Sequence, residues 1–126
     1  MITKIIVPGR FASLNEWIDA NRRTRGNWSP GHDMKKTDQR AIRQYIPKGL
    51  RLEGKGKLFL EYTFYEPNTR RDLDNINGYF HKVFQDALVE AGVIDDDDQK
   101  HIRGMTDYFD VDKKFPRVEI TIEVTK

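Results

Sequence analysis

The 126-residue sequence contains no cysteine. Disulfide bonds, a thiolate nucleophile and cysteine-ligated zinc or iron–sulfur centres are therefore excluded. The sequence also has no apolar run near the ~18 residues needed to cross a bilayer, and its N-terminus lacks the apolar stretch and the cleavage site of a signal peptide. From these absences we expect a cytoplasmic protein without a membrane partner.

Length and composition predict a single domain over residues 1–126. Hydrophobic residues make up 37% and charged residues 33% of the chain, against about 25% charged residues in an average protein. A chain of this length can bury one hydrophobic core. No repeat, low-complexity tract or internal linker divides the sequence.

Charge is distributed unevenly along the chain. Residues 1–56 carry a net charge of +7, and residues 57–126 carry a net charge of −5. The first half therefore suits a polyanionic partner, and the second half contains clustered carboxylates. An ordinary mixed surface is the alternative interpretation of these counts.

The apolar pattern predicts an alternation of strands and helices. The strands are expected at residues 2–7, 58–65, 102–111 and 118–125, and the helices at 33–46 and 74–91. Asp33 is placed to cap the first helix, whereas residues 8–33 have few periodic apolar positions and predict a long loop. We expect an α+β fold: a small mixed or antiparallel sheet of about four strands with two helices packed on one face.

Two aspartates, Asp72 and Asp74, stand where a predicted strand gives way to the longest predicted helix. A carboxylate at a helix N-terminus is stabilised by free backbone amides, so capping would explain a single aspartate. Two aspartates flanked by Arg70 and Arg71 are harder to explain in this way, because one cap position needs one side chain. This cluster is the first candidate functional site.

A second acidic cluster, Asp95 to Asp98, follows the same helix. Adjacent carboxylates repel one another unless a cation lies among them, and Mg²⁺ prefers oxygen ligands; a solvated acidic turn is the alternative. A helix of about 18 residues is about 27 Å long. The two clusters can therefore share a metal only if the chain folds back or if a partner subunit supplies one of them, and the sequence leaves both arrangements open.

Lys82 lies eight residues after Asp74 and on nearly the same face of the predicted helix, with Gly78 between them. A lysine in this position can reach toward a bound phosphate, and a glycine leaves room for a close approach to the backbone. A solvated surface lysine is the alternative.

Cationic side chains are interleaved with an aromatic one in the first half of the chain. They are Arg22, Arg23, Arg25 and Trp28 in the predicted loop, and Lys36, Arg40 and Arg43 on one face of the first helix. Such cations neutralise phosphates, and a tryptophan stacks on unpaired bases. These residues predict a DNA-binding surface, and a solvated basic face is the alternative.

Three segments occur together in the second half: Arg-Arg-Asp-Leu-Asp-Asn at 70–75, Asp-Ala-Leu-Val-Glu-Ala-Gly at 86–92, and Ile-Asp-Asp-Asp-Asp-Gln at 94–99. In this combination the sequence resembles the RusA family of Holliday-junction resolvases. The resemblance implies a small Mg²⁺-dependent endonuclease, with Mn²⁺ as a substitute, that acts in DNA recombination and repair. It also implies a homodimer that makes paired symmetric nicks in four-way DNA junctions, without a protein cofactor.

The same resemblance implies roles for individual residues. The metal-binding set is Asp72, Asp74, Asp97 and its neighbour Asp96; the catalytic set is Asp72, Asp74, Asp97 and Lys82; the DNA-binding set adds Arg70 and Arg71 to the basic residues named above. The family's lysine follows the second aspartate by four residues, where this chain has Gly78. Because this helix is about four residues longer, counting back from Asp86 leads to Lys82 instead.

Three competing functions fit parts of the sequence. A non-catalytic junction-binding protein would keep the fold but would not need Asp72, Asp74 and Asp97. A less selective nuclease would cut flaps or forks, and the sequence hardly separates it from a resolvase. A Ca²⁺-binding module is disfavoured by the basic first half.

Overall fold

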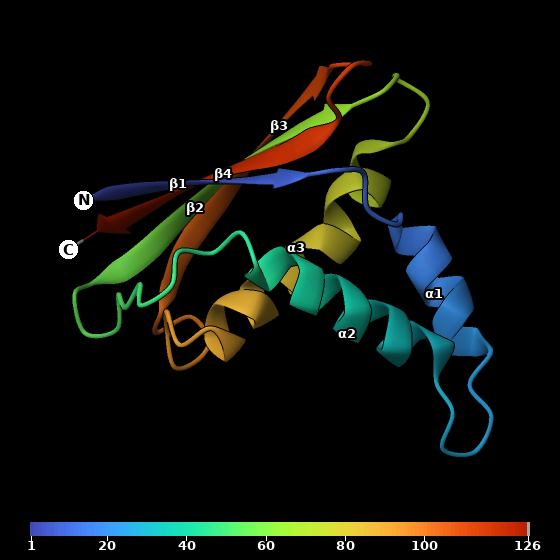
Figure 1. Cartoon of the computed structure of the whole chain (residues 1–126), viewed down its shortest axis with the longest axis horizontal. Coiled ribbons are helices and arrows are strands. Elements are labelled where there is room, and N and C mark those ends of the chain that lie inside the picture. Colours follow the sequence, from blue (N-terminus) through green and yellow to red (C-terminus); the bar gives the residue numbers. More distant parts are fainter. Residues whose placement is uncertain (126) are drawn as a thin grey trace.

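The sheet has the strand order β1-β4-β2-β3, and three helices cover one of its faces (Figure 1). The structure is a computed structural model that describes residues 1–125. The elements in chain order are β1 (Ile2–Pro8), α1 (Leu14–Arg22), α2 (Pro30–Arg43), β2 (Lys57–Glu66), α3 (Leu73–Glu90), β3 (Ile102–Val111) and β4 (Arg117–Thr125). The predicted α+β class is confirmed, with one helix more than expected.

The sheet is mixed, because β4 is antiparallel to both β1 and β2 whereas β3 is parallel to β2. Parallel neighbours need a crossover connection, and α3 supplies it between β2 and β3. The chain thus enters α3 from the end of β2 and leaves it toward the start of β3. This topology places the two acidic clusters at opposite ends of α3.

The hydrophobic core lies between the sheet and α3. Alternate residues of β2 face the helix, and aromatic rings meet there: the Tyr62 and Phe84 centroids are 5.8 Å apart, edge to face, a favourable arrangement. The buried apolar residues include Leu58, Leu60, Tyr62, Phe64, Ile76, Phe80, Val83, Phe84, Ile120 and Ile122. Within residues 1–125, no helix combines the length and the hydrophobicity that a membrane crossing requires.

The predicted loop over residues 8–33 is wrong, because α1 occupies its centre. Ser13 and Glu16 form a capping box: the Glu16 amide donates to Ser13 Oγ at 3.0 Å, and the Ser13 amide donates to Glu16 Oε1 at 3.1 Å. Asp33 is likewise not an N-cap. The second helix begins at Pro30, and the Ser29 hydroxyl accepts from the His32 amide.

Helix α1 packs against the N-terminal half of α3. A Cβ atom placed on Gly78 would lie 3.1 Å from Cδ2 of Leu14, so this glycine makes room for a side chain of α1. The interpretation of Gly78 as an opening for a bound phosphate is therefore wrong. The backbone amide of Asn15 also donates to Asn75 Oδ1 at 3.1 Å, which fixes α1 beside the start of α3.

Replacement of Ser13 by Ala should lower the free energy of unfolding by about 1 kcal/mol, because it removes the hydroxyl that accepts from the Glu16 amide. Ser13→Thr, which keeps the hydroxyl, is the matched control. Urea denaturation followed by circular dichroism measures the difference. Equal midpoints for Ser13→Ala and the wild type would show that the capping box does not stabilise the fold.

Candidate functional site

Asp72 and Asp74 lie at the start of α3 with their side chains exposed. Asp72 occupies the N-cap position, but its side chain makes no capping hydrogen bond. Its backbone carbonyl instead accepts from the amides of Asn75 and Ile76, at 3.0 and 3.2 Å. The carboxylate of Asp72 is therefore not consumed by capping. Asp74 follows in the first turn, so two carboxylates are presented to solvent at one helix end.

Arg71 fastens the segment before α3 to the rest of the fold. Its guanidinium donates to the Phe11 carbonyl at 2.9 Å and pairs with Glu16 at 3.2 Å and with the buried Glu66 at 3.7 Å. Only 15% of its side chain is exposed. The backbone amide of Ser13 and, more weakly, Arg71 hold the pKa of Glu16 below its ordinary value. Arg71 thus supports the position of the two aspartates, while its neighbour Arg70 is exposed.

The second acidic cluster folds back along α3 only as far as Lys82. The Lys82 ammonium lies 3.6 Å from Oδ2 of Asp97 and 3.2 Å from Oδ1 of Asp86. Burial acts to lower the pKa of Lys82, but the hydrogen bond and charge of Asp86, and then those of Asp97, outweigh it and raise the pKa. Lys82 is thus a charged group held between two carboxylates.

One chain does not bring the two acidic clusters together. Eight residues separate Asp74 from Lys82, which corresponds to about 12 Å along the helix axis. Within residues 1–125, no group of three or more histidine, aspartate or glutamate side chains is arranged to hold a metal ion. Two carboxylates nevertheless suit Mg²⁺, which completes its octahedral shell with water and phosphate oxygens. Asp72 and Asp74 fit such a site.

The loop that carries the second cluster is anchored by residues 51–53. The Arg51 guanidinium donates to the Gly92 carbonyl at 2.8 Å and pairs with Asp95 at 2.7 Å. Glu53 accepts from the Asp95 amide at 2.7 Å and lies 3.1 Å from Nε2 of His101. Asp95 thus has a structural role, and these long-range contacts were not predicted from the sequence.

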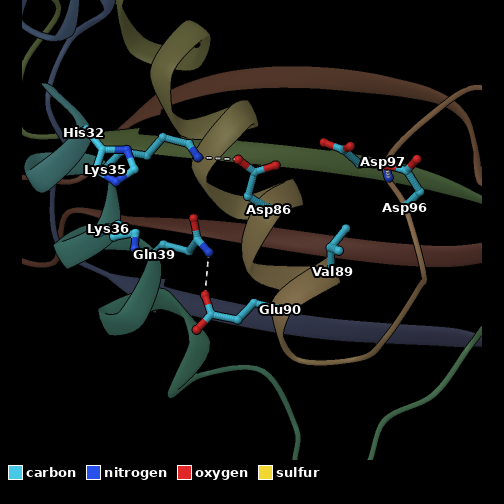
Figure 2. Close-up of a pocket in the computed structure, with 9 residues that line it drawn as sticks. All are labelled: His32, Lys35, Lys36, Gln39, Asp86, Val89, Glu90, Asp96 and Asp97. Carbon is cyan, nitrogen blue, oxygen red and sulfur yellow. Dashed lines mark hydrogen bonds and ion pairs between the residues drawn. The ribbon is translucent and has the colours of Figure 1, made fainter. Parts of the chain in front are cut away.

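A cleft of about 390 Å³ separates α2 from this loop (Figure 2). Asp96 and Asp97 face it from the loop, and Asp86 lies between them and α2. The lining residues are His32, Lys35, Lys36, Gln39, Asp86, Val89, Glu90, Asp96 and Asp97. Lys35 pairs with Asp86, and neither residue was expected to contribute to the site. The spacing of Lys82 and Asp86, four residues apart on a helix, is a sequence signal that identifies Asp86.

The predicted DNA-binding residues divide into two groups. The turn between α1 and α2 extends away from the sheet (Figure 1), and its tip is closed by paired backbone hydrogen bonds between Arg25 and Trp28. Arg22, Arg23, Arg25 and Trp28 are all exposed there, as are Lys36 and Arg40 on α2. Arg43, in contrast, pairs with Glu90 of α3 at 3.0 Å.

A further cluster links α3 to the edge strand β3. Nε2 of His81 lies 2.6 Å from Oδ1 of Asp107, and the side-chain Nδ2 of Asn77 donates to Oδ2 of Asp107 at 2.9 Å. The His81 ring also packs against Tyr62, with centroids 4.6 Å apart. Because Asp107 lies far from α3 in the sequence, no local pattern predicts this contact.

A family model described as Endodeoxyribonuclease RusA matches residues 27–123 of the chain. The match runs from the end of the α1–α2 turn to β4 and contains both acidic clusters together with Lys82. No curated protein matches the chain.

His101 predicts a pH-dependent anchoring of the loop before β3. Its hydrogen bond to Asp98, at 2.6 Å, and the nearby Glu53 raise the pKa of His101. A pKa raised by folding contributes stability below the ordinary value of about 6.5 and loses it as the pH rises through the folded value. Hydrogen-exchange protection of residues 95–102, corrected for intrinsic rates, should therefore fall across that range. His101→Gln should remove the dependence, and an unchanged profile in this variant would contradict the assignment.

Proposed function

The chain belongs to the RusA family of endodeoxyribonucleases, and from this premise we propose that it is a Mg²⁺-dependent enzyme that resolves four-way DNA junctions by paired symmetric nicks. The observation that supports this proposal most directly is the exposure of the Asp72 and Asp74 side chains. Both carboxylates are exposed at one helix end, and the adjacent Arg71 is directed to Glu16 and Glu66 instead of to them.

Asp72 and Asp74 would hold the metal ion. When bound there, Mg²⁺ would polarise the phosphodiester, lower the pKa of a bound water and stabilise the leaving oxygen. The two aspartates supply hard oxygen ligands at the N-terminal end of α3. The helix end thus provides a fixed pair of ligands on an exposed surface that a DNA backbone can approach.

Lys82 would contact the phosphate group at which negative charge develops. Its raised pKa keeps the ammonium charged at neutral pH, and 51% of its side chain is exposed. A fixed positive charge near the reacting phosphate stabilises the transition state more than the ground state. Lys82 therefore has the charge and the exposure that this role requires.

The basic turn and α2 would hold the DNA. Arg22 ends α1, where it lies 3.7 Å from Asp19. Arg23 and Arg25 follow it in the turn, and Trp28 in the same turn is 56% exposed. Cations that follow a backbone combined with an exposed aromatic ring are typical of sites that bind unpaired or distorted DNA. Lys36 and Arg40 extend this positive surface along α2, whereas Arg43 pairs with Glu90 at the surface and Arg71 is largely buried.

A homodimer would match the two-fold symmetry of a four-way junction, since an isologous dimer presents two equivalent sites. The separation of about 12 Å between Asp74 and Lys82 further supports a second subunit. We propose that each metal held by Asp72 and Asp74 faces Lys82 and Asp97 of the other chain. A partner subunit would then supply the groups that the rigid helix α3 separates within one chain.

Replacement of Asp72 or Asp74 by Asn should reduce junction cleavage by at least about a hundredfold, because each change removes a metal ligand. Junction binding should persist or become tighter, since the basic residues are unchanged and a negative charge is lost. Asp110→Asn, on the exposed edge strand, is the matched control. Cleavage of a labelled four-way junction in Mg²⁺, together with a gel-shift titration, measures both effects.

A fork, a linear duplex and an EDTA lane belong in the same experiment. Paired symmetric nicks confined to the junction in Mg²⁺ are the expected result. Equal cutting of all substrates would replace the resolvase by a general structure-selective nuclease. Binding without any product would identify a non-catalytic junction-binding protein, and cleavage by an Asp72→Asn/Asp74→Asn double variant would end the metal-site assignment.

A mixed dimer of Asp74→Asn and Asp97→Asn chains tests the shared site. If each site combines both subunits, one site carries both changes and the other is intact, so the mixed dimer should nick one strand of each junction. If each site lies within one chain, both sites are damaged and activity is lost. A mixed dimer of Asp72→Asn and Asp74→Asn chains is the control, because it should be inactive under either arrangement.

A further inference from the structure

Four side chains of alternating charge cross the molecule beside the cleft. Lys35 of α2 pairs with Asp86 of α3, Asp86 pairs with Lys82 one turn earlier, and Lys82 pairs with Asp97 of the acidic loop. The Lys35–Asp86 contact is visible at the cleft wall (Figure 2). Asp86 is the centre of this row, because each of its two carboxylate oxygens holds a different lysine.

The Lys82 side chain points in an unusual direction for a residue on a helix. Side chains on a helix lean toward its N-terminus, so an isolated lysine here would extend toward Gly78 and Asp74. The preferred order for a helical ion pair is also the reverse, with the acidic residue four positions before the lysine. Lys82 nevertheless points toward the C-terminal end of α3, where Asp86 and Asp97 lie.

Asp86 is better suited to fix this direction than an ordinary surface carboxylate. Only 21% of its side chain is exposed, compared with 51% for Lys82. Exposed ion pairs between flexible side chains contribute little and rarely fix a conformation. Asp86 is itself fixed by Lys35, which comes from a different helix and whose side chain is 22% exposed.

We propose that Asp86 is a positioning residue: it holds the Lys82 ammonium beside Asp97, and Lys35 of α2 holds Asp86 in turn. This inference deepens the proposed function, on which it rests, because the role of Lys82 at the phosphate comes from there. Asp86 and Lys35 would not contact the phosphate. They would fix the position of the Lys82 ammonium and prevent it from extending toward Asp72 and Asp74.

The test follows the Lys82 side chain directly in the full-length protein. Nuclear Overhauser contacts between the Lys82 Hε and Asp97 Hβ protons, assigned by their loss in Lys82→Gln, are measured by NMR at one neutral pH in the wild type and in Asp86→Asn. Glu90→Gln is the matched control, because Glu90 also joins α3 to α2, through Arg43 at 3.0 Å, without contacting Lys82. Asp86→Glu, which keeps the charge, is the rescue variant.

The expected result is a weakened Lys82–Asp97 contact in Asp86→Asn, partial restoration in Asp86→Glu and an unchanged contact in Glu90→Gln. Junction cleavage by Asp86→Asn should fall on the order of ten- to a hundredfold, the range for outer groups that orient functional side chains. Asp86→Glu should recover part of the lost cleavage. Thermal unfolding, measured alongside, shows how much of the loss comes from stability alone.

Two outcomes would overturn the inference. One is an unchanged Lys82–Asp97 contact in Asp86→Asn, which would leave Asp86 with a purely structural link to α2. The other is a lost contact with an unchanged cleavage rate, which would show that the position of Lys82 does not matter for the reaction. A wild type that cleaves no DNA would instead overturn the proposed function, since the Lys82–Asp97 contact would still show whether Asp86 holds the lysine.

Discussion

The rigidity of α3 is the constraint on which the arrangement of the site depends. An 18-residue helix keeps its ends about 27 Å apart, and its burial against β2 leaves no freedom to bend the two acidic clusters toward each other. Because α3 is also the crossover between the parallel strands β2 and β3, its start and its end lie at opposite ends of the sheet. The loop after α3 shortens this distance by folding back, but it stops at Lys82. The proposal that a partner subunit completes the site follows from this separation.

The sequence predicts those parts of the fold in which a local pattern is strong. The alternation in β4 and the apolar stripe of α3 were sufficient to predict both elements within a residue or two. Helix α1 was missed because Ala20 is its one fully buried residue, which leaves little periodic signal. Its capping box, Ser13 with Glu16, was nevertheless present in the sequence, as were Ser29 and Pro30, a frequent start of a helix. These two cap signals predict helix starts within residues 8–33, where the apolar pattern alone predicts a loop.

The site divides in a similar way between local and distant contacts. Asp72, Asp74 and Asp97 come from short motifs, and Lys82 follows from helix spacing, so each can be named from the sequence. The groups that orient them come from elsewhere in the chain: Lys35 pairs with Asp86 across 51 positions, and Arg51 pairs with Asp95 across 44. Single-sequence reasoning lacks access to such pairs, because they depend on how α2 and residues 51–53 pack. It therefore names the candidate residues of the proposed site but not the residues that hold them in place.

The structure shows where the positive charge of the first half of the chain lies and which carboxylates it neutralises. Part of the positive charge of the first half is used within the fold, where Lys35, Arg43 and Arg51 neutralise carboxylates that follow Lys82 in sequence. Other cations of the first half, among them Arg23, Arg25, Lys36 and Arg40, are exposed on the α1–α2 turn and α2, where they are available to a polyanion. Asp72 and Asp74, at the start of α3, are not neutralised by the adjacent Arg71, because Arg71 pairs with Glu16 and Glu66. Like charges held close together without a cation favour the binding of one. The fold thus stabilises one acidic cluster with its own cations and leaves Asp72 and Asp74 exposed, as the proposed metal site requires.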